Sequence, residues 1–483
     1  MLDGIDDIQW SRLGHAYGSA ADVPDQIRAL RSPEQPVRQQ ALNALFGNIF
    51  HQGTRYQASA YAVPFLLELL ADPDTPEPDW LLTLLTSLAI GYDESFLPDG
   101  FPVGECRQAA RGGRELLAAK PPPWVGEDED EDDKEYVEYE YVESLSAADQ
   151  DRLWTYVALA VYDAVRAGVP LFRSLLDHSD PGVRAGAAYA LGWFPEEAAG
   201  SLPALTALIA GGGRAERVGG VDAERPDGAD FEPSDGAEVE RPDGAEVERP
   251  DGADFEPSGG ADFEPSGGAE FEPSGGVRRT PAEVATAVVA AGLLGAAPYA
   301  GLLADPRPVV RWAAAVGRAR VLGAEVDAAT VDELLRWLAV TPAGSPHRPE
   351  TDGHVPFLDG DLGGYAALAL RQLGPAYADR AFDALLDRLP AVSGTEALPV
   401  ATEALRTAFP AGAPPTGAPV AELLPDQRRL VEVLARSPRP WLIGESVFGN
   451  FSSLLRGYGL PADRDAMRAY LADSVGVAGG GPG

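Results

Sequence analysis

Cysteine and lysine are nearly absent from this chain of 483 residues. Cys106 is the only cysteine, which excludes an intramolecular disulfide and a cysteine-based zinc site. Lysine occurs only at Lys120 and Lys134, and 38 basic residues face 75 acidic ones, for a formal net charge of −37. This charge argues against the basic groove that nucleic-acid phosphates require, so we expect no nucleic-acid partner.

Signals for export and membrane insertion are missing as well. Residues 1–7 are acidic and lack the basic and apolar regions of a secretory signal. Residues 284–304 are uncharged over a length that would span a bilayer, but Pro298 interrupts them where a second helix would begin. We therefore expect two helices there, no membrane partner and a cytoplasmic location.

The acidic charge lies mainly in two stretches. Residues 127–143 hold eleven acids against Lys134, and residues 219–276 hold eighteen acids against three arginines. The second stretch is a tandem octapeptide with units beginning at 219, 227, 235, 243, 251, 259 and 267. Small residues, acids and proline in these proportions bury too little apolar surface to fold, so we predict two disordered acidic inserts.

Two interpretations of the octapeptide insert stay open. Its phenylalanines, each flanked by acids, would suit a multivalent bait for a basic partner; they are Phe231, Phe255, Phe263 and Phe271. Alternatively, the insert is a slipped DNA repeat, tolerated because it replaces a surface turn between helices predicted at 202–210 and 280–294. Loop-closure entropy rises only with the logarithm of length, so such an insert costs about 2.4 kcal/mol.

Capping sequences mark the predicted starts of several helices. Ser146, Thr280 and Thr330 each stand three residues before an acid, which is the spacing of a capping box. Asp180 and Asp305 each precede a proline, which suits the N-cap and first helical positions. Apolar residues then recur at intervals of three and four, and no strand alternation is sustained, so the expected fold class is all-α.

Three separated stretches repeat one another, at residues 36–42, 180–188 and 305–314. Each follows an apolar helical run and a polar turn, and each opens an Ala-rich helical segment. A recurring helix pair of this kind is typical of an α-solenoid. We therefore expect an α-solenoid of irregular helix pairs, from which the acidic inserts project.

Residues 175–192 read Leu-Leu-Asp-His-Ser-Asp-Pro-Gly-Val-Arg-Ala-Gly-Ala-Ala-Tyr-Ala-Leu-Gly and resemble a HEAT repeat, of the short kind also seen in phycocyanobilin-lyase proteins. Residues 302–323 are a second good match, and residues 30–45 are a weaker one. The resemblance implies HEAT-like helix pairs with an internal ladder of aspartates and arginines along the stack, and it assigns no activity. The residues that match the ladder are Arg38, Asp180, Arg184, Asp305 and Arg311.

The repeats and inserts together suggest six segments. We expect N-terminal repeats and a cap at 1–119, an acidic linker at 120–143, HEAT-like repeats at 144–210, the disordered octapeptide insert at 211–279, further repeats with a C-terminal cap at 280–473, and a disordered tail at 474–483.

Few residues suggest chemistry. None of the five histidines is followed by glutamate, which excludes the paired iron ligands of HEAT-like hydroxylases, and no nucleotide-binding loop, nucleophile elbow or zinc-protease motif occurs. The one constellation that would suit a divalent metal lies in the loop 341–364; it comprises His347, Asp352, His354, Asp359 and Asp361. The alternative is a long loop between helices, and we expect no catalytic residue, no cofactor and no metal.

Two segments near the N-terminus are dense in aromatic residues, histidine and arginine beside glycine. Such residues supply binding hot spots when they are exposed, and they equally suit a cap that closes the first repeat against water. The candidates for partner contact are Trp10, His15, Tyr17, His51, Arg55 and Tyr56. At the other end, the residues expected to close the last repeat are Trp441, Phe448, Phe451 and Tyr458.

These expectations describe a non-catalytic scaffold or adaptor that binds a protein partner, and the acidic inserts favour a basic one. Two alternatives stay open. One is a metal-dependent enzyme that uses residues 341–364, and the other is an acidic inhibitor or immunity-type protein that mimics nucleic acid.

Overall fold

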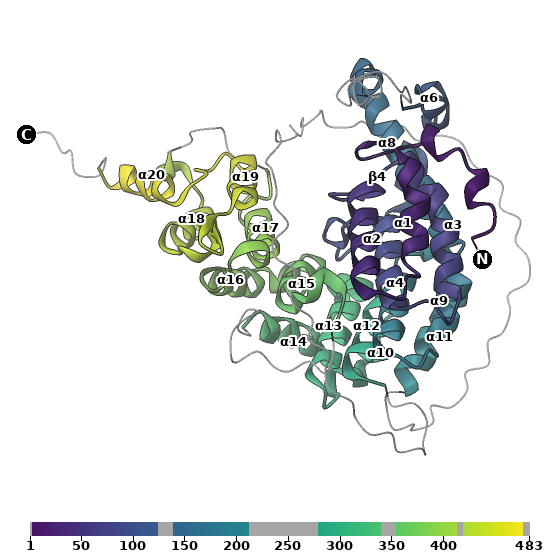
Figure 1. The fold of residues 1–483 in the computed structure, drawn as a ribbon. Coiled ribbons are helices and arrows are strands. Elements are labelled where there is room, and N and C mark those ends of the chain that lie inside the picture. The colour runs from purple at the N-terminus through teal and green to yellow at the C-terminus, as the bar shows by residue number, and fades with distance from the viewer. Residues whose placement is uncertain (1, 124–138, 212–278, 340–353, 413–418, 477–483) are drawn as a thin grey trace, which may run out of the picture. The chain divides into compact units, whose positions relative to one another are not determined.

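The computed structural model describes residues 2–123, 139–211, 279–339, 354–412 and 419–476. All of them belong to one unit, which comprises Met1–Arg214 and Val277–Gly483. Helices predominate (Figure 1), so the predicted all-α class is confirmed. The octapeptide insert, the acids from 127 to 138 and residues 477–483 of the tail lie outside the described residues.

The helices before the octapeptide insert are mostly joined by short connections. They are α1 (Val23–Ala29), α2 (Gln35–Asn48), α3 (Gln57–Ala71), α4 (Pro78–Ile90), α5 (Val103–Ala109), α6 (Gly113–Ala119), α8 (Ala147–Arg166), α9 (Val169–Leu175), α10 (Pro181–Leu191) and α11 (Ala198–Gly211). Those after it are α12 (Pro281–Leu293), α13 (Pro308–Leu322), α14 (Ala328–Leu338), α15 (Leu362–Ala369), α16 (Ala378–Arg388), α17 (Ala397–Ala408), α18 (Pro425–Arg436), α19 (Gly449–Gly457) and α20 (Arg464–Gly476).

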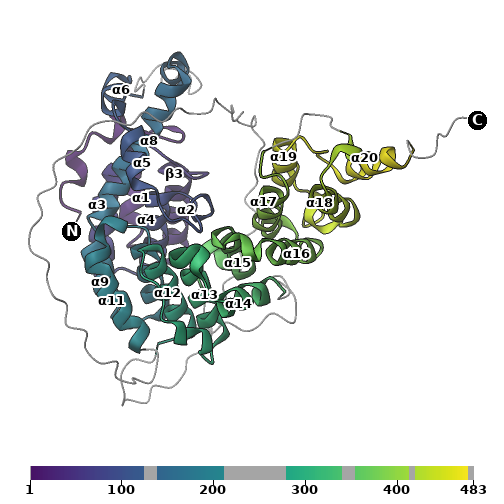
Figure 2. The same cartoon turned by 180° about the vertical axis from the view of Figure 1, so that it is seen from behind.

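Most helices pack on helices that are close to them in the chain. α3 and α4 pack on α8, α10 packs on α9 and α12, and α13 packs on α12, α14 and α15. The series continues as α15 packs on α17, α17 on α16 and α18, and α18 on α20. Figure 2 shows α12 and α13 side by side, in agreement with these contacts.

α12 is buried on every side. Each of residues 282–293 is buried, because α10, α11 and α13 all pack against this helix. The uncharged run at 284–304 divides as expected: α12 ends at Leu293, Pro298 follows, and a 3-10 helix, η6 (Ala300–Ala304), begins after it. Within the part of the chain that the structure describes, no helix is long and apolar enough to cross a membrane.

Close approach of α12 to α13 depends on two glycines. A Cβ added at Gly292 would lie 2.8 Å from the Cα of Gly317, which is closer than real Cβ contacts allow.

We expect Gly292→Val to lower the free energy of unfolding by about 1–3 kcal/mol, because the helices must move apart. Gly47→Ala in α2, where an added Cβ meets nothing within 4 Å, should instead be neutral or stabilise by up to about 1 kcal/mol. Urea unfolding followed by circular dichroism measures both, and equal effects of the two variants would contradict the packing role.

Three of the five predicted caps are confirmed. Ser146, Asp180 and Thr280 each accept a hydrogen bond from a backbone N–H of the first turn, and Glu283 completes the capping box with Thr280. The prediction for Thr330 was wrong, because α14 begins earlier and its cap is Asp327. Asp327 accepts from the backbone N–H of Thr330 (2.8 Å), which places Thr330 inside the first turn.

The prediction for Asp305 was also wrong. α13 begins at Pro308, so Asp305 lies too far before the helix to cap it. Its carboxylate instead binds the guanidinium of Arg307 at 2.8 Å. Pro308 occupies the first helical position of α13, where proline is favoured, and this explains why the helix begins there.

Three small β-hairpins add to the helices, and the sequence pattern did not predict them. They are formed by β1 (Gly14–His15) with β2 (Gly18–Ser19), β3 (Phe50–His51) with β4 (Thr54–Arg55), and β5 (Leu442–Ile443) with β6 (Ser446–Val447). Each strand has two residues, and each hairpin closes through a two-residue turn. Strands this short are stabilised by the neighbouring helices rather than by their own pairing.

Candidate partner-binding surface

The first two hairpins lie against each other near the N-terminus. In the turn of the β1–β2 hairpin, the backbone N–H of Ala16 donates to the carbonyl of Asn48, the last residue of α2 (2.9 Å). Tyr17 in the same turn is 60% exposed. Its hydroxyl hydrogen-bonds to Nδ1 of His51 (3.3 Å), and the two rings meet edge to face at 5.4 Å. Tyr17 is therefore an exposed aromatic residue held in a fixed orientation.

His15 is the support beneath Tyr17. Its side chain is buried, and Nδ1 accepts the backbone N–H of Tyr17 (3.0 Å). Nε2 therefore carries the proton and donates to Asp22 (3.0 Å). Burial works to raise the pKa of Asp22, but its hydrogen bonds, of which the one from His15 is the strongest, outweigh burial, and the pKa lies below its usual value. His15 thus fixes the hairpin and presents no free nitrogen to a partner.

Trp10 is also an interior residue. Its indole is 4% exposed, donates its N–H to the carbonyl of Ile5 (2.7 Å) and packs near the ring of Phe65. Trp10 and His15 hence close the N-terminal end, as a cap would, whereas Tyr17 and His51 reach the surface.

Tyr92 also packs on the β3–β4 hairpin. It is 48% exposed and packs edge to face on Phe50, with ring centroids 5.6 Å apart. Its ring also covers Gly53, where an added Cβ would lie 2.9 Å from a ring carbon. Gln52 and Gly53 both have positive φ (48° and 83°), as the tight turn of a hairpin requires.

Arg55 is the last residue of β4 and bonds to the turn that Tyr92 covers. Nη1 donates to the carbonyl of Gly53 (2.5 Å), and Nε is buried without a partner among the described residues. Burial lowers the pKa of Arg55 to about 10, and the nearby thiol of Cys106 offsets this only in part. Arg55 is therefore a partly buried cation without an acidic partner in the described part of the chain.

Tyr56 points away from this group toward α8. Burial raises its pKa to about 12, and its ring meets Trp154 edge to face at 6.4 Å. We name the set around the hairpin that comprises the exposed Tyr17 and Tyr92 and the half-buried His51 and Arg55 the hairpin surface. The sequence predicted three of these four residues, and it missed Tyr92, which reaches the hairpin from the end of α4.

The three ladder arginines occupy equivalent positions. Arg38 binds Glu77 (2.5 Å and 2.7 Å), Arg184 binds Glu283, and Arg311 binds Glu333 at 3.5 Å. Each arginine also donates to one or two carbonyls five or six residues before it, at the turn that precedes its helix. The acidic partners are glutamates of a following helix or its cap, whereas Asp180 caps α10 and Asp305 binds Arg307.

A second polar cluster joins the loop after α4 to the segment before α15. Oδ2 of Asp93, in the 3-10 helix η4 (Asp93–Ser95), accepts from the hydroxyl of Tyr189 (3.0 Å) and from the backbone N–H of Leu358 (2.8 Å). Burial, together with the charges of Glu94 and Asp359, raises the pKa of Asp93 to about 6 against the effect of these two bonds. Leu358 and Asp359 both have a φ of 50°, a left-handed conformation that is strained without glycine. Asp93 thus helps to hold a strained turn.

The candidate metal loop lies partly outside the described residues, which exclude His347 and Asp352. His354 and Asp359 are exposed, and Asp361 caps α15 by accepting from the backbone N–H of Gly364 (2.8 Å). Among the residues that can be placed, no three metal-ligating side chains gather.

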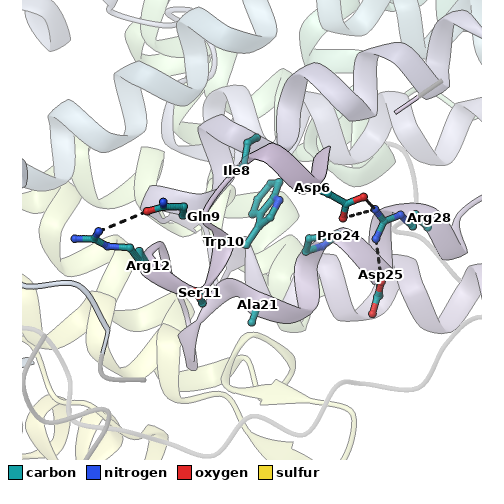
Figure 3. A pocket seen from close by; sticks show the side chains of 10 residues that line it. All are labelled: Asp6, Ile8, Gln9, Trp10, Ser11, Arg12, Ala21, Pro24, Asp25 and Arg28. Carbon is teal, nitrogen blue, oxygen red and sulfur yellow. Dashed lines mark hydrogen bonds and ion pairs between the residues drawn. The ribbon is translucent and has the colours of Figure 1, made fainter. Parts of the chain in front are cut away.

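A shallow groove of about 570 Å³ lies beside η1 (Ile5–Asp7), η2 (Trp10–Arg12) and α1 (Figure 3). It is lined by Asp6, Ile8, Gln9, Trp10, Ser11, Arg12, Ala21, Pro24, Asp25 and Arg28. Arg28 is paired with Asp6 (2.6 Å) and Asp25 (3.1 Å), as the dashed lines in Figure 3 show. The groove brings no nucleophile together with a base, so it lacks the features of an active site.

No protein-family model matches the chain, and no curated protein matches it. Among solved structures, the crystal structure of an engineered protein from the Northeast Structural Genomics Consortium aligns over 95% of this chain and 100% of its own. The sequence identity is 14% and the TM-score is 0.26. Values this low carry no argument about fold or function.

Proposed function

We propose that the protein is a non-catalytic, cytoplasmic interaction scaffold, an α-solenoid of HEAT-like helix pairs that binds a protein partner through the hairpin surface. The packing of helices on their neighbours in sequence supports the solenoid, because each repeat of a solenoid contacts mainly adjacent repeats. The equivalent bonds of Arg38, Arg184 and Arg311 support a repeated helix-pair unit. The free thiol of Cys106 is compatible with a reducing compartment.

The observation that carries the proposal is the pair of exposed tyrosines that flank one rigid hairpin. Tyr17 and Tyr92 are held by ring contacts and by a tight turn, so little side-chain entropy remains to be lost on binding. Tyrosine in such a setting is a frequent hot-spot residue, since it offers apolar area and a hydroxyl with few rotatable bonds. A basic partner that also contacts the acidic inserts stays part of the hypothesis.

Affinity capture of the full-length protein, with mass spectrometry, tests the proposal. We expect one protein partner in stoichiometric amounts, and at least tenfold less of it with the double variant Tyr17→Ser/Tyr92→Ser. Tyr299→Ser is the matched control, because Tyr299 is 76% exposed in a different part of the unit. Titration of the purified partner should show a Kd at least tenfold higher for the double variant alone, about 1.4 kcal/mol of binding free energy.

Two outcomes would overturn the proposal. One is the absence of a stoichiometric protein partner, and the other is equal binding by the wild type and the double variant. Circular dichroism before each titration ensures that a loss of binding does not reflect unfolding.

A further inference from the structure

Residues 91–101, which lie between α4 and α5, contact parts of the chain that are far away in sequence. Asp93 accepts from the backbone N–H of Leu358, and the carbonyl of Asp99 accepts from Nη2 of Arg320 in α13 (2.6 Å). These partners stand 265 and 221 positions further along the chain. Each repeat of a solenoid contacts mainly its neighbours, and α10 and α12 come between α4 and α13 in the packing series. Residues 91–101 therefore bypass these two helices, and we name them the strap.

The end of the strap at Asp99 is held by several bonds. The carboxylate pairs with Arg371 and accepts from the side-chain amide of Gln372, both of which follow directly after α15. Arg371 also donates to the carbonyl of Leu97 (2.7 Å). The side chain of Leu97 is 2% exposed, and Phe101 stacks on a tyrosine ring of α8 with the centroids 4.6 Å apart. Loss of any one of these contacts leaves the others, so we expect this end to stay in place.

The end of the strap at Asp93 depends on one carboxylate oxygen. Oδ2 accepts from the hydroxyl of Tyr189 and from the backbone N–H of Leu358, which belongs to the 3-10 helix η8 (Phe357–Gly360). Leu358 and Asp359 are both held at a φ of 50°, so breaking the bond also allows a strained turn to relax. The first residue of η8 is fully buried, which anchors that helix. η4 is therefore the part that is able to move away.

The groups around Asp93 favour its neutral form. Burial, with added repulsion from Glu94 in η4 and Asp359 in η8, raises its pKa to about 6 from an ordinary value of 3.8. The other titratable groups that act with it are the hydroxyls of Tyr189 in α10 and Tyr365 in α15. None of these four neighbours is a cation that would compensate an ionised carboxylate. The closed contact thus binds the proton more tightly than an open one, and it weakens as the pH rises from about 4 to about 6.

We propose that the strap opens from one end: η4 is held on η8 while Asp93 is protonated and separates from η8 more readily once Asp93 is ionised, whereas Asp99 keeps the other end bound. This inference is independent of the proposed function, because it concerns contacts within the chain alone. Local openings of this kind cost less free energy than global unfolding, so the protein stays folded while one end of the strap opens. The strap thus gives the fold a contact between distant helices whose strength depends on pH.

Hydrogen–deuterium exchange of the full-length protein, followed by mass spectrometry with fragmentation to single amides, measures the opening of each end. The N–H of Leu358 reports on the Asp93 end. The N–H of Gly100, which donates to the carbonyl of Phe96 (2.8 Å), reports on the Asp99 end. We expect the protection factor of Leu358 to fall about tenfold from pH 5 to pH 7 and to stay nearly constant above pH 7. The protection factor of Gly100 should not change, since protection factors already divide out the intrinsic effect of pH on exchange.

Substitutions separate the roles of the two ends. Asp93→Asn should remove the pH dependence, because asparagine does not titrate, and the control Asp74→Asn, at an exposed aspartate, should leave it unchanged. Asp99→Ala should lower the protection of Gly100 at every pH, because it breaks the bonds to η9 (Leu370–Gln372). Gln372→Ala removes only one of these bonds and is the milder variant if Asp99→Ala proves to be misfolded by circular dichroism.

Three results would overturn the inference. The first is a protection factor of Leu358 that does not change with pH, and the second is a change that persists in Asp93→Asn. The third is an equal change at Leu358, at Gly100 and in the amides of α12, which would show global unfolding instead of opening at one end.

Discussion

Glu283→Ala should lower the free energy of unfolding by about 3–5 kcal/mol, the largest effect that we expect from one polar substitution in this protein. Glu283 and Arg184 form an ion pair in which the side chains are 1% and 2% exposed. One carboxylate oxygen of Glu283 accepts from Arg184, and the other accepts from the backbone N–H of Thr280 (2.5 Å). Removing the carboxylate leaves a guanidinium buried without its counter-charge and also opens the capping box of α12.

A double variant without either charge separates these contributions. Arg184→Met/Glu283→Leu removes both charges, so it should cost much less than Glu283→Ala, although the carbonyls of His178 and Ser179 lose a donor. Asp6→Ala, which breaks the exposed pair with Arg28, is the control and should change stability far less than Glu283→Ala, because solvent screens an exposed pair. Urea unfolding at neutral pH measures all of them. A cost below 1 kcal/mol for Glu283→Ala would show that the pair does not hold α10 and α12 together.

Asp93→Asn should stabilise the protein at neutral pH, although it removes a charged hydrogen-bond acceptor. The pKa of Asp93 lies at about 6 in the folded protein, above its usual value of 3.8, chiefly because burial disfavours the ionised form. The folded state therefore binds the proton more tightly than the unfolded state, and stability falls as the pH rises from about 4 to about 6. Above pH 7 the loss is about 3 kcal/mol, and at pH 5 it is about half of that.

Asparagine at position 93 keeps a side-chain oxygen that accepts hydrogen bonds, and it has no group that titrates. Because Tyr189 and Leu358 both donate to the same oxygen of Asp93, the amide oxygen of asparagine is able to accept both bonds. The advantage of Asp93→Asn over the wild type should therefore be largest above pH 7 and shrink toward pH 5. Urea unfolding at pH 5, 6, 7 and 8 measures it, with the exposed Asp74→Asn as a control. A pH-independent difference between Asp93→Asn and the wild type would contradict the assigned pKa.

The sequence predicted the features that depend on local chemistry. Ser146, Asp180 and Thr280 were identified as caps because a cap and its partners lie within four residues of one another. The prediction of Thr330 as a cap failed because Asp327, three residues earlier, also has a side-chain oxygen that is able to cap the helix. Spacing along the sequence does not show which of the two residues takes that role. The hairpin at residues 50–55 was missed because two-residue strands are too short to show alternation, even though Gln52 and Gly53 carry a turn signal.

Residues of the site were harder to predict because burial decides their role. Trp10, His15 and Tyr17 all belong to the same aromatic-rich and histidine-rich stretch of sequence. In the structure, however, Trp10 and His15 are buried and Tyr17 is exposed. Arg55 has no carboxylate partner among the described residues, and the sequence carries no signal of that absence. The ladder partner of Arg184 lies 99 residues away, beyond the octapeptide insert, so no local pattern connects it to Glu283.

The position of the octapeptide insert has a consequence for how this chain is able to change. Gly211 ends α11 and Arg279 precedes α12, and a Cβ added at Gly211 would lie 3.8 Å from the side chain of Arg279. The fold thus brings the two ends of the insert together, whatever its length. For a connection of this length, one added octad changes the closure free energy by only about 0.1 kcal/mol, because that free energy grows with the logarithm of length. Gaining or losing a whole unit at this point should therefore hardly change the free energy of folding, while α11 and α12 keep their contact.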